Sequence, residues 1–592
     1  MNYRSYQHAK LSLTAVSLVL AMTEGASSAA ATTLQDPPRS LATLLPEVAT
    51  PSVTDTTAAP PQRGAAAPQN NEQAAPVSPQ AAPISAAPAD PSYTADGLGS
   101  GFLHRLFGYY KLEMGHAAAP SDPSAPSSRR DGWSPAPQTT PPMPFTEWPY
   151  GGATSLGVTR PNAVDSPLMV ALAPSGLGQA LSKAHVQVYG WVDVGGNYGS
   201  NDVRGGNAPG AYNYEPRRVQ LDQAVVYVER TPDTVQTDHV GWGFRVSGIY
   251  GVDYRYTISY GLFSSQLTKR NNDYGFDMPM VYGEVYFPNV AKGLLIRAGR
   301  FISVPDIEAQ LAPNNYMYTH SMTYTFDNYT NTGVVATLAV SKNLFLQAGI
   351  TDGTETALWN AGRTYANPYP NPLYPGARFP KDPGNEPSFT GCIRYQTSDA
   401  RTSIYGCVNG INSGRWGYNN LQWRGLTLYH KFSDKWHVSA ETYNIVERGV
   451  PNALNPVVQD AYSNGGTPFS PQRTPFNAPG LAQCNDPNAL RCDIYAEAGL
   501  VYLNYSPNAL NNFTLRGEYL DDQEGQRTGV KTRYAAGAIG WQHWLSPQIE
   551  LRPEVAYYRA LDALAFNGNS NRGIAPNKQD SIVLSGDVII HF

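Results

Sequence analysis

Five charged residues near the middle of the chain have the types and spacing to set up an electric field across a narrow passage. They are Arg297 and Arg300, followed within the segment 303–331 by Asp306, Glu308 and Asp327. Carboxylates that face guanidinium groups across a gap orient a charged solute as it passes. The same five residues would also suit a capped helix and salt bridges that brace an exposed loop, so both roles stay open.

The sequence contains none of the common catalytic motifs. There is no GxSxG, no HExxH and no Walker-type loop. His320, Ser321 and Asp327 supply the residue types of a hydrolytic triad, but neighbours of these types often occur by chance. We therefore expect no catalytic residue, no metal and no cofactor, and a protein that is not an enzyme.

Four cysteines could form two disulfides. Cys392 and Cys407 lie symmetrically about a predicted turn, where neighbouring strands would bring them opposite each other on a face turned inward. Cys484 and Cys492 are close enough in sequence to close a small ring. In an exported protein such cysteines form disulfides more naturally than a metal site, with free buried thiols as the alternative.

Strands must position these residues, because apolar and polar side chains alternate with period two from residue 185 to the end. We expect about 16 strands. They cover 185–199, 217–229, 241–254, 280–287, 293–302, 332–340, 344–351, 388–396, 402–411, 421–432, 436–447, 493–505, 512–520, 532–544, 548–560 and 581–592.

The links between these strands alternate between short and long. Short links such as 341–343 and 433–435 alternate with mostly much longer ones such as 352–387 and 448–492. A soluble β-sandwich, the alternative fold, gives no reason for this alternation. An outer-membrane barrel does, because it has short periplasmic turns and long external loops. The predicted fold class is therefore all-β, a transmembrane antiparallel β-barrel of about 16 strands.

The alternation also assigns side chains to lipid or to lumen. An Arg or Lys on the lipid side at mid-bilayer costs roughly 2 to 4 kcal/mol, so charged strand residues should face inward. Those predicted to line the lumen are Arg394, Arg516, Glu518, Glu550, Arg552 and Glu554. Because both signs of charge point inward, we expect a hydrated bore and not a packed plug.

The final segment, 581–592, has one face suited to lipid. That face carries Ile582, Leu584, Gly586, Val588, Ile590 and the terminal Phe592. A chain that stops on an aromatic residue at the end of such a strand resembles the closing strand of a bacterial outer-membrane barrel. An ordinary half-buried strand of a soluble sandwich is the alternative.

The N-terminal part predicts export. Residues 1–31 have the layout of a signal peptide, with a helical anchor as the alternative. Residues 32–141 form a Pro/Ala-rich leader predicted to be disordered in the periplasm, apart from an amphipathic island at 101–114. This island could dock on the barrel, a membrane or a partner, with a transient helix that has no partner as the alternative. Residues 142–184 form an irregular segment expected in or under the barrel mouth, and the barrel itself spans 185–592.

Composition agrees with a membrane location. The 592 residues include 38 Tyr and 10 Trp, side chains that concentrate where an apolar surface meets water. Beyond the N-terminus no run approaches the roughly 18 apolar residues that a spanning helix needs, so strands must cross the membrane. The net charge of -5 argues against a nucleic-acid partner.

Two stretches resemble the OmpL-like family of β-barrel porins. They are 238–261, DHVGWGFRVSGIYGVDYRYTISYG, and 297–333, in which PDIEAQLAPNN is the most specific run. The resemblance extends over about 185–592 and implies an outer-membrane porin that allows passive diffusion of small hydrophilic solutes. In porins the third external loop, here 303–331, folds into the lumen and narrows it.

Expected partners are outer-membrane lipid and lipopolysaccharide, small hydrophilic solutes, and further copies of the chain in a homo-oligomer. The alternative function is a structural or adhesive outer-membrane barrel whose leader tethers a periplasmic or cell-wall partner. An outer-membrane hydrolase is a third hypothesis. TonB-coupled uptake is disfavoured, because it would need about 22 strands and a folded plug.

Overall fold

A computed structural model gives the structure of the protein. It describes residues 98–111, 166–234, 236–257, 259, 261–268, 270–302, 307–356, 385–399, 401–414, 420–463, 480–508, 510–546, 548–569 and 572–592. These residues belong to one compact unit, Pro83–Phe592. The predicted signal peptide and most of the predicted leader lie outside the described residues.

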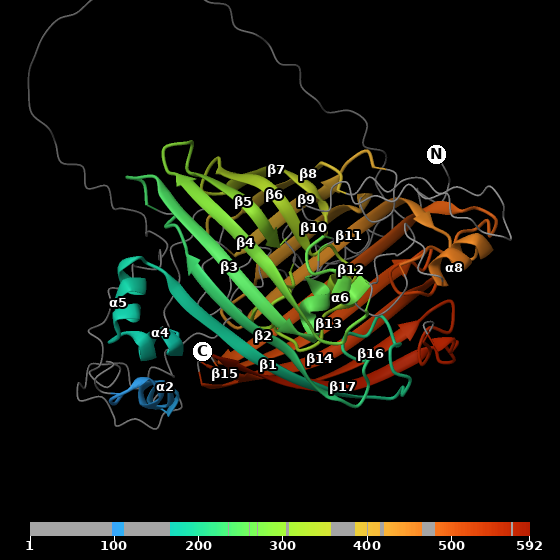
Figure 1. The fold of residues 1–592 in the computed structure, drawn as a ribbon, viewed down its shortest axis with the longest axis horizontal. Helices are drawn as coiled ribbons and strands as arrows, with labels where there is room; N and C mark the ends of the chain where they lie inside the picture. The colour runs from blue at the N-terminus through green and yellow to red at the C-terminus, as the bar shows by residue number, and fades with distance from the viewer. Residues whose placement is uncertain are drawn as a thin grey trace, which may run out of the picture. The chain divides into compact units, whose positions relative to one another are not determined.

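The described part of the chain is dominated by strands (Figure 1). The strands are β1 (Gln187–Gly199), β2 (Val219–Arg230), β3 (Gly241–Gly251), β4 (Gly275–Phe287), β5 (Leu294–Ile302), β6 (Thr330–Ala339), β7 (Leu344–Thr354), β8 (Ser388–Gln396), β9 (Thr402–Ile411), β10 (Gln422–Lys431), β11 (Trp436–Pro451), β12 (Arg491–Asn508), β13 (Asn511–Asp522), β14 (Thr532–Ser546), β15 (Ile549–Leu551), β16 (Glu554–Ala560) and β17 (Asp580–His591).

The strands close into one antiparallel barrel. Each strand from β1 to β14 pairs with the next in sequence, and β17 returns to pair with β1, for example Val194 with Val588. β15 and β16 share one position between β14 and β17. They are separated at Pro553, which has no N–H to donate to the ladder. The barrel therefore has 16 strand positions, and the prediction is confirmed.

The predicted alternation of faces is also confirmed. In β17 the side chains of Ile582 and Leu584 are 53% and 56% exposed, whereas Val583 and Ile589 are buried. The exposed face is apolar and the buried face lines the barrel interior, as the membrane requires.

Short helices accompany the barrel. They are α2 (Phe102–Lys111), α4 (Pro167–Leu172), α5 (Gly176–Lys183), α6 (Ser265–Thr268), α7 (Met322–Thr325) and α8 (Pro456–Ser463), with 3-10 helices η3 (Val252–Tyr256) and η4 (Ala312–Asn314). None of the helices in the described part of the chain has the length and apolar character needed to cross a membrane.

α2 and α4 pack where β1 begins and β17 ends. Arg105 of α2 donates through Nε to the Ala171 carbonyl at 2.9 Å, and Tyr110 donates its hydroxyl to the His591 carbonyl. Ser166, which caps α4, donates to the Val188 carbonyl at 3.2 Å. The described parts of the predicted island and of the pre-barrel segment therefore dock at the periplasmic end of the barrel.

Candidate functional site

The link between β5 and β6 folds into the barrel. We call residues 307–329 the inner segment; every one of them is buried. It contains η4 and α7, and Ser321 caps α7 by accepting the Tyr324 N–H at 3.0 Å. Asp306, predicted to begin this segment with a turn, lies outside the described residues.

Charged residues of the wall hold the backbone of the inner segment. Arg552 donates to the carbonyls of Ala312 and Asn315 at 2.6 and 2.9 Å. Arg516 donates to the Thr319 carbonyl at 2.6 Å, while Glu554 accepts the Thr319 N–H at 3.0 Å. Buried peptide groups need such partners, so the wall charges satisfy a segment that has little secondary structure of its own.

Glu308 ties the inner segment to itself and to β12. Its carboxylate accepts the Ser321 N–H at 3.1 Å, and also accepts the hydroxyls of Ser321 and Tyr502. Burial raises the pKa of Glu308 to about 7, against the opposing effect of the nearby Arg516 guanidinium. Glu308 therefore lies against the β12 and β13 side of the barrel.

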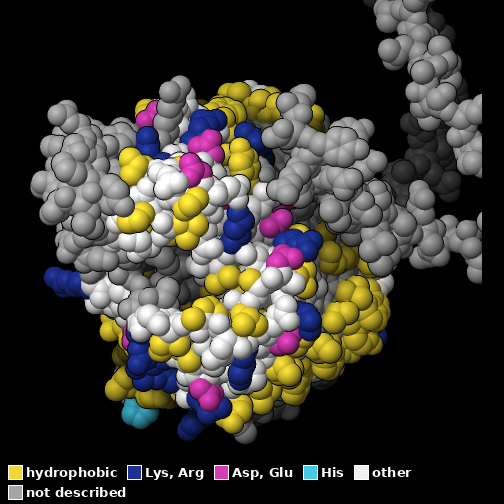
Figure 2. Space-filling view, turned by 90° about the vertical axis from the view of Figure 1, so that its right-hand side faces the viewer, with side chains coloured by type: hydrophobic (Ala, Val, Ile, Leu, Met, Phe, Trp, Pro, Cys, Tyr) yellow, Lys and Arg dark blue, Asp and Glu magenta, His cyan; other side chains and the backbone are white. Residues whose placement is uncertain are grey.

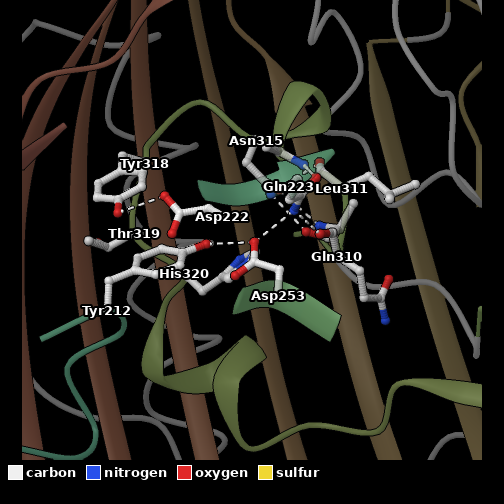
Figure 3. A network of polar contacts seen from close by, with 12 residues as sticks. Tyr212, Asp222, Gln223, Asp253, Gln310, Leu311, Asn315, Tyr318, Thr319 and His320 are labelled. Carbon is white, nitrogen blue, oxygen red and sulfur yellow. Dashed lines mark hydrogen bonds and ion pairs between the residues drawn. The ribbon is translucent and has the colours of Figure 1, made fainter. Parts of the chain in front are cut away.

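A second polar network joins the inner segment to β2 and η3 (Figure 3). Gln223 donates to Asp253 at 2.8 Å and to the Gln310 carbonyl at 2.7 Å, and accepts the Ala312 N–H at 3.1 Å. Tyr318 donates to Asp222 at 3.0 Å. Because Gln223 and Tyr318 bind acceptors on different elements, this network fixes the inner segment in one orientation.

Gly195 of β1 permits the close approach in this network. A Cβ atom at Gly195 would lie 2.3 Å from both the Asp222 carboxylate and the Tyr318 hydroxyl. Contacts that short do not occur between real side chains, so only glycine fits while Tyr318 binds Asp222.

The triad suggested by residue type does not assemble. The Ser321 hydroxyl donates to Glu308, and Asp327 accepts from the Asn328 N–H at 2.7 Å. His320 instead lies among aromatic rings, with the Tyr324 ring centroid 4.2 Å from its own. Burial lowers the pKa of His320 well below 6.5.

The arginines near the start of the loop pair with a neighbouring strand. Arg297 donates to Glu284 at 2.7 Å, and Arg300 donates to Asp277 at 2.8 Å. Both acids lie on β4 and not on the inner segment. The Arg297 guanidinium also lies over the Tyr282 ring at 4.4 Å, and the facing of Arg297 with Glu308 across a constriction stays a prediction.

Arg394 of β8, like Arg297, lies over an aromatic ring. Its guanidinium lies 3.8 Å from the centroid of the Phe345 ring on β7 and donates to the Tyr405 hydroxyl at 3.2 Å. The interior of β4 to β9 thus combines guanidinium groups with aromatic rings.

The predicted inward charges all face the interior, but not open water. Arg516 pairs with Glu518 at 2.6 Å, and Arg552 pairs with Asp587. The inward charged residues, all buried, are Arg394, Arg516, Glu518, Glu550, Arg552 and Glu554. Protein groups surround these side chains. The inner segment contacts four of them, Arg516, Glu518, Arg552 and Glu554. Arg394 instead contacts Phe345 and Tyr405, and Glu550 accepts from Gln542 at 2.7 Å.

The backbone at Asp327 helps to attach the inner segment to an external loop. Its carbonyl and that of Phe326 accept from Arg527 at 2.9 and 2.7 Å. Arg527 lies in the loop after β13, so a second external loop also holds the inner segment.

Both predicted disulfides are present. Cys392 and Cys407 are direct partners in the β8–β9 register and are bonded on the buried face. The second disulfide joins Cys484, in the loop before β12, to Cys492, the second residue of β12. The inward direction of Cys392 and Cys407 agrees with the predicted face.

Several residues of the site were not predicted as such. Asp222, Gln223 and Asp253 belong to the network of Figure 3, and Asp193 lies near Asp222 and Asp587. Alternation in β1 and β2 was a usable signal for Asp193 and Gln223. It was not one for Asp222, which faces inward at a register shift between the two strands, or for Asp253, which lies in η3. Among the described residues no group of three or more His, Cys, Asp or Glu side chains could hold a metal ion.

Comparison with known proteins gives one family. The family model described as "Putative beta-barrel porin-2, OmpL-like" matches residues 185–592. No curated protein sequence matches the chain.

Solved structures with a similar arrangement of strands include three bacterial outer-membrane proteins. The anion-selective porin of Comamonas acidovorans has a TM-score of 0.40 at 11% identity, covering 69% of this chain and 99% of its own. The outer membrane channel DcaP of Acinetobacter baumannii gives 0.40 at 11%, covering 69% and 97%. OmpT of Vibrio cholerae gives 0.36 at 9%, covering 69% and 99%. The family match, and not these distant similarities, carries the assignment.

Proposed function

Because the chain belongs to the OmpL-like family of β-barrel porins, we propose that it is a passive diffusion channel in which the inner segment narrows the bore. Family membership makes the protein a porin of the outer membrane; the proposal concerns how solutes pass. The observation that carries it is a closed barrel with residues 307–329 buried inside and bonded to its wall.

The proposed route follows the side of the lumen opposite the main attachments. The bonds from the inner segment reach β2 and the wall from β11 to β16, as at Gln223, Glu441 and Glu554, and one further bond joins Asn328 to Asn409 near the loop end of β9. On the other side, Gln347 of β7 donates to Thr337 of β6 at 3.0 Å, and both side chains are only half-buried. We place the path of small hydrophilic solutes beside this pair.

Thiol labelling tests the route. We expect a small charged thiol reagent to reduce the single-channel current of Gln347→Cys, because the modified side chain would obstruct the path. Ser439→Cys is the matched control, since Ser439 faces inward on β11 but is fully buried. Equal loss of current in both variants, or none in Gln347→Cys, would contradict the route.

We also propose that the charged residues predicted from the sequence contribute to the ion selectivity of the channel. Arg297 and Arg394 lie on the proposed solute side, and Glu308 on the attached side. Arg297→Gln should shift the reversal potential in a salt gradient if its charge contributes to the field. An unchanged reversal potential would leave Arg297 as a brace for β4 and β5.

We also propose that the protein acts only as a channel and not as an enzyme. The support is that Ser321, His320 and Asp327 each have other environments, as described above. Loss of a measured hydrolytic activity on Ser321→Ala would argue for the hydrolase instead.

A second candidate function is supported by α2. This helix lies in the predicted leader and docks at the periplasmic end through Arg105 and Tyr110. Docking there would hold a leader-bound periplasmic or cell-wall partner next to the barrel. Capture of such a partner by the full chain, but not by a chain lacking residues 32–97, would support this tether.

We also propose that the protein forms a homo-oligomer. Measurement of its oligomeric state in mild detergent would test this.

A further inference from the structure

The outer surface of β13 to β17 carries two neighbouring arginines near its loop end. Arg533 of β14 and Arg559 of β16 point away from the lumen, and their side chains are 49% and 48% exposed. Ala535 is the direct partner of Arg559, so Arg533 is its diagonal neighbour on the same face. Diagonal neighbours of this kind lie roughly 7 to 8 Å apart, which brings both guanidinium groups within reach of one ligand.

Each guanidinium is oriented by a carboxylate. Arg533 donates to Asp562 through Nε and Nη2 at 2.8 and 2.7 Å, and Arg559 donates to Asp580 at 3.3 Å. A guanidinium has five N–H donors, so these bonds leave donors for a further acceptor. Exposed ion pairs of this type are weak, and a more highly charged oxyanion can share the same arginines.

A continuous apolar surface lies directly on the membrane side of the two arginines. It is formed on adjacent strands by Leu515, Ile539, Val555, Ile582 and Leu584, each at least half exposed. Tyr519 and Tyr557 lie between this surface and the arginines, where aromatic side chains meet the headgroup region. Figure 2 views the molecule from its loop end. Dark-blue Lys and Arg side chains there lie next to magenta acidic side chains and border yellow hydrophobic side chains.

The same level on the other side of the barrel is different. Tyr250 of β3 marks this level. It lies eight residues from Trp242, near the other end of its strand, just as Arg533 of β14 lies eight residues from Trp541. Tyr250 and its partner Phe276 are exposed there, as are Ile350 and its partner Phe389. The pair of arginines is therefore confined to one part of the circumference and does not continue around the rim at Tyr250 or Ile350.

We propose that Arg533 and Arg559 bind the phosphate of an outer-leaflet phosphoglycolipid, whose acyl chains lie on the apolar surface below. The position at the upper edge of the lipid-facing band selects a lipid headgroup, and the two guanidinium groups select a phosphate. This site lies outside the lumen and takes no part in the proposed solute route.

Native mass spectrometry of the full chain in mild detergent tests the site, with bis-phosphorylated lipid A as the probe. We expect Arg533→Gln/Arg559→Gln to weaken lipid A binding at least ten-fold. Arg533→Lys/Arg559→Lys should bind better than the double glutamine variant, because it keeps the charge. Arg230→Gln, at the periplasmic end of β2, is the matched control and should bind like the wild type.

Three results would overturn the site: unchanged affinity in the double glutamine variant, equally tight binding of dephosphorylated lipid A by the wild type, or displacement of lipid A by millimolar inorganic phosphate. Loss of an oligomer with unchanged lipid binding would show instead that this surface contacts a second copy. Single-channel conductance should stay at the wild-type level in the double variant, so failure of this site and failure of the proposed route are distinguishable.

Discussion

Glu308 is a buried carboxyl whose hydrogen bonds hold two parts of the inner segment together and join them to β12. Burial raises its pKa from 4.5 to about 7. The folded protein therefore binds the proton more tightly than the unfolded chain does. The stability that protonated Glu308 contributes is fully present below about pH 4.5 and is lost as the pH rises through about 7.

We expect Glu308→Gln to remove this part of the pH dependence, because glutamine keeps the shape but does not ionise. Relative to the variant, the wild type should lose at most about 3 kcal/mol of unfolding free energy between pH 4.5 and pH 8. Denaturant titration in detergent micelles at several pH values measures the difference. Glu497→Gln, on the outer face of β12, is the control; a wild type that becomes more stable than the variant with rising pH would contradict the sign.

Residue roles in this region depend on partners that sequence spacing does not reveal. Tyr502 is 194 residues from Glu308, and Glu554 is 235 residues from Thr319. Alternation showed correctly that Glu518 and Arg552 face inward, but a face does not state what covers it. The burial of these residues could not be predicted, because the segment that covers them has no periodic pattern of its own.

At the scale of elements, the β8–β9 hairpin carries a disulfide between directly paired residues. Cys392 and Cys407 are separated by 15 residues in the chain, and Cys484 and Cys492 by 8. In the chain-entropy model the larger loop gives the larger stabilisation, about 3 kcal/mol for 15 residues.

We therefore expect Cys392→Ala/Cys407→Ala to lower the unfolding free energy by about 3 kcal/mol. Cys484→Ala/Cys492→Ala should have a smaller effect, because its loop is shorter. Thermal or denaturant unfolding under oxidising conditions measures both, with the wild type under reducing conditions as a further comparison. A larger loss in the Cys484/Cys492 variant would contradict the loop-length explanation.

The elements themselves were largely predictable, for a physical reason. A strand between lipid and lumen must alternate, so all 16 strand positions appear in the sequence with small errors at their ends. The break at Pro553 was not predicted, because Ile549 to Tyr557 alternates without interruption. The docking of α2 was one of three options that amphipathic spacing left open, since a helical face does not identify its partner.

At the scale of the whole molecule, the outer face must match the bilayer in depth. Val501 lies midway along β12 between Tyr505, near the short turn, and Glu497, near the loop end, and it is exposed on the apolar face. Val340 is also exposed but lies directly after Ala339, the last residue of β6, at the periplasmic end of the barrel.

We expect Val501→Arg to lower the unfolding free energy in lipid by about 2 to 4 kcal/mol, because the charge enters the middle of the hydrocarbon. Val340→Arg should cost at most about 1 kcal/mol, since its guanidinium reaches the interface. Unfolding in vesicles measures both. Equal costs at the two positions would contradict the bilayer depths assigned to Val501 and Val340.

The bond from Tyr110 to the carbonyl of His591 joins a helix near the beginning of the chain to its penultimate residue. During biogenesis this contact can form only after the final strand has been translocated and paired. A reporter pair placed on α2 and at the C-terminus would therefore mark the moment at which the barrel is complete. It would separate finished molecules from those still threading into the membrane.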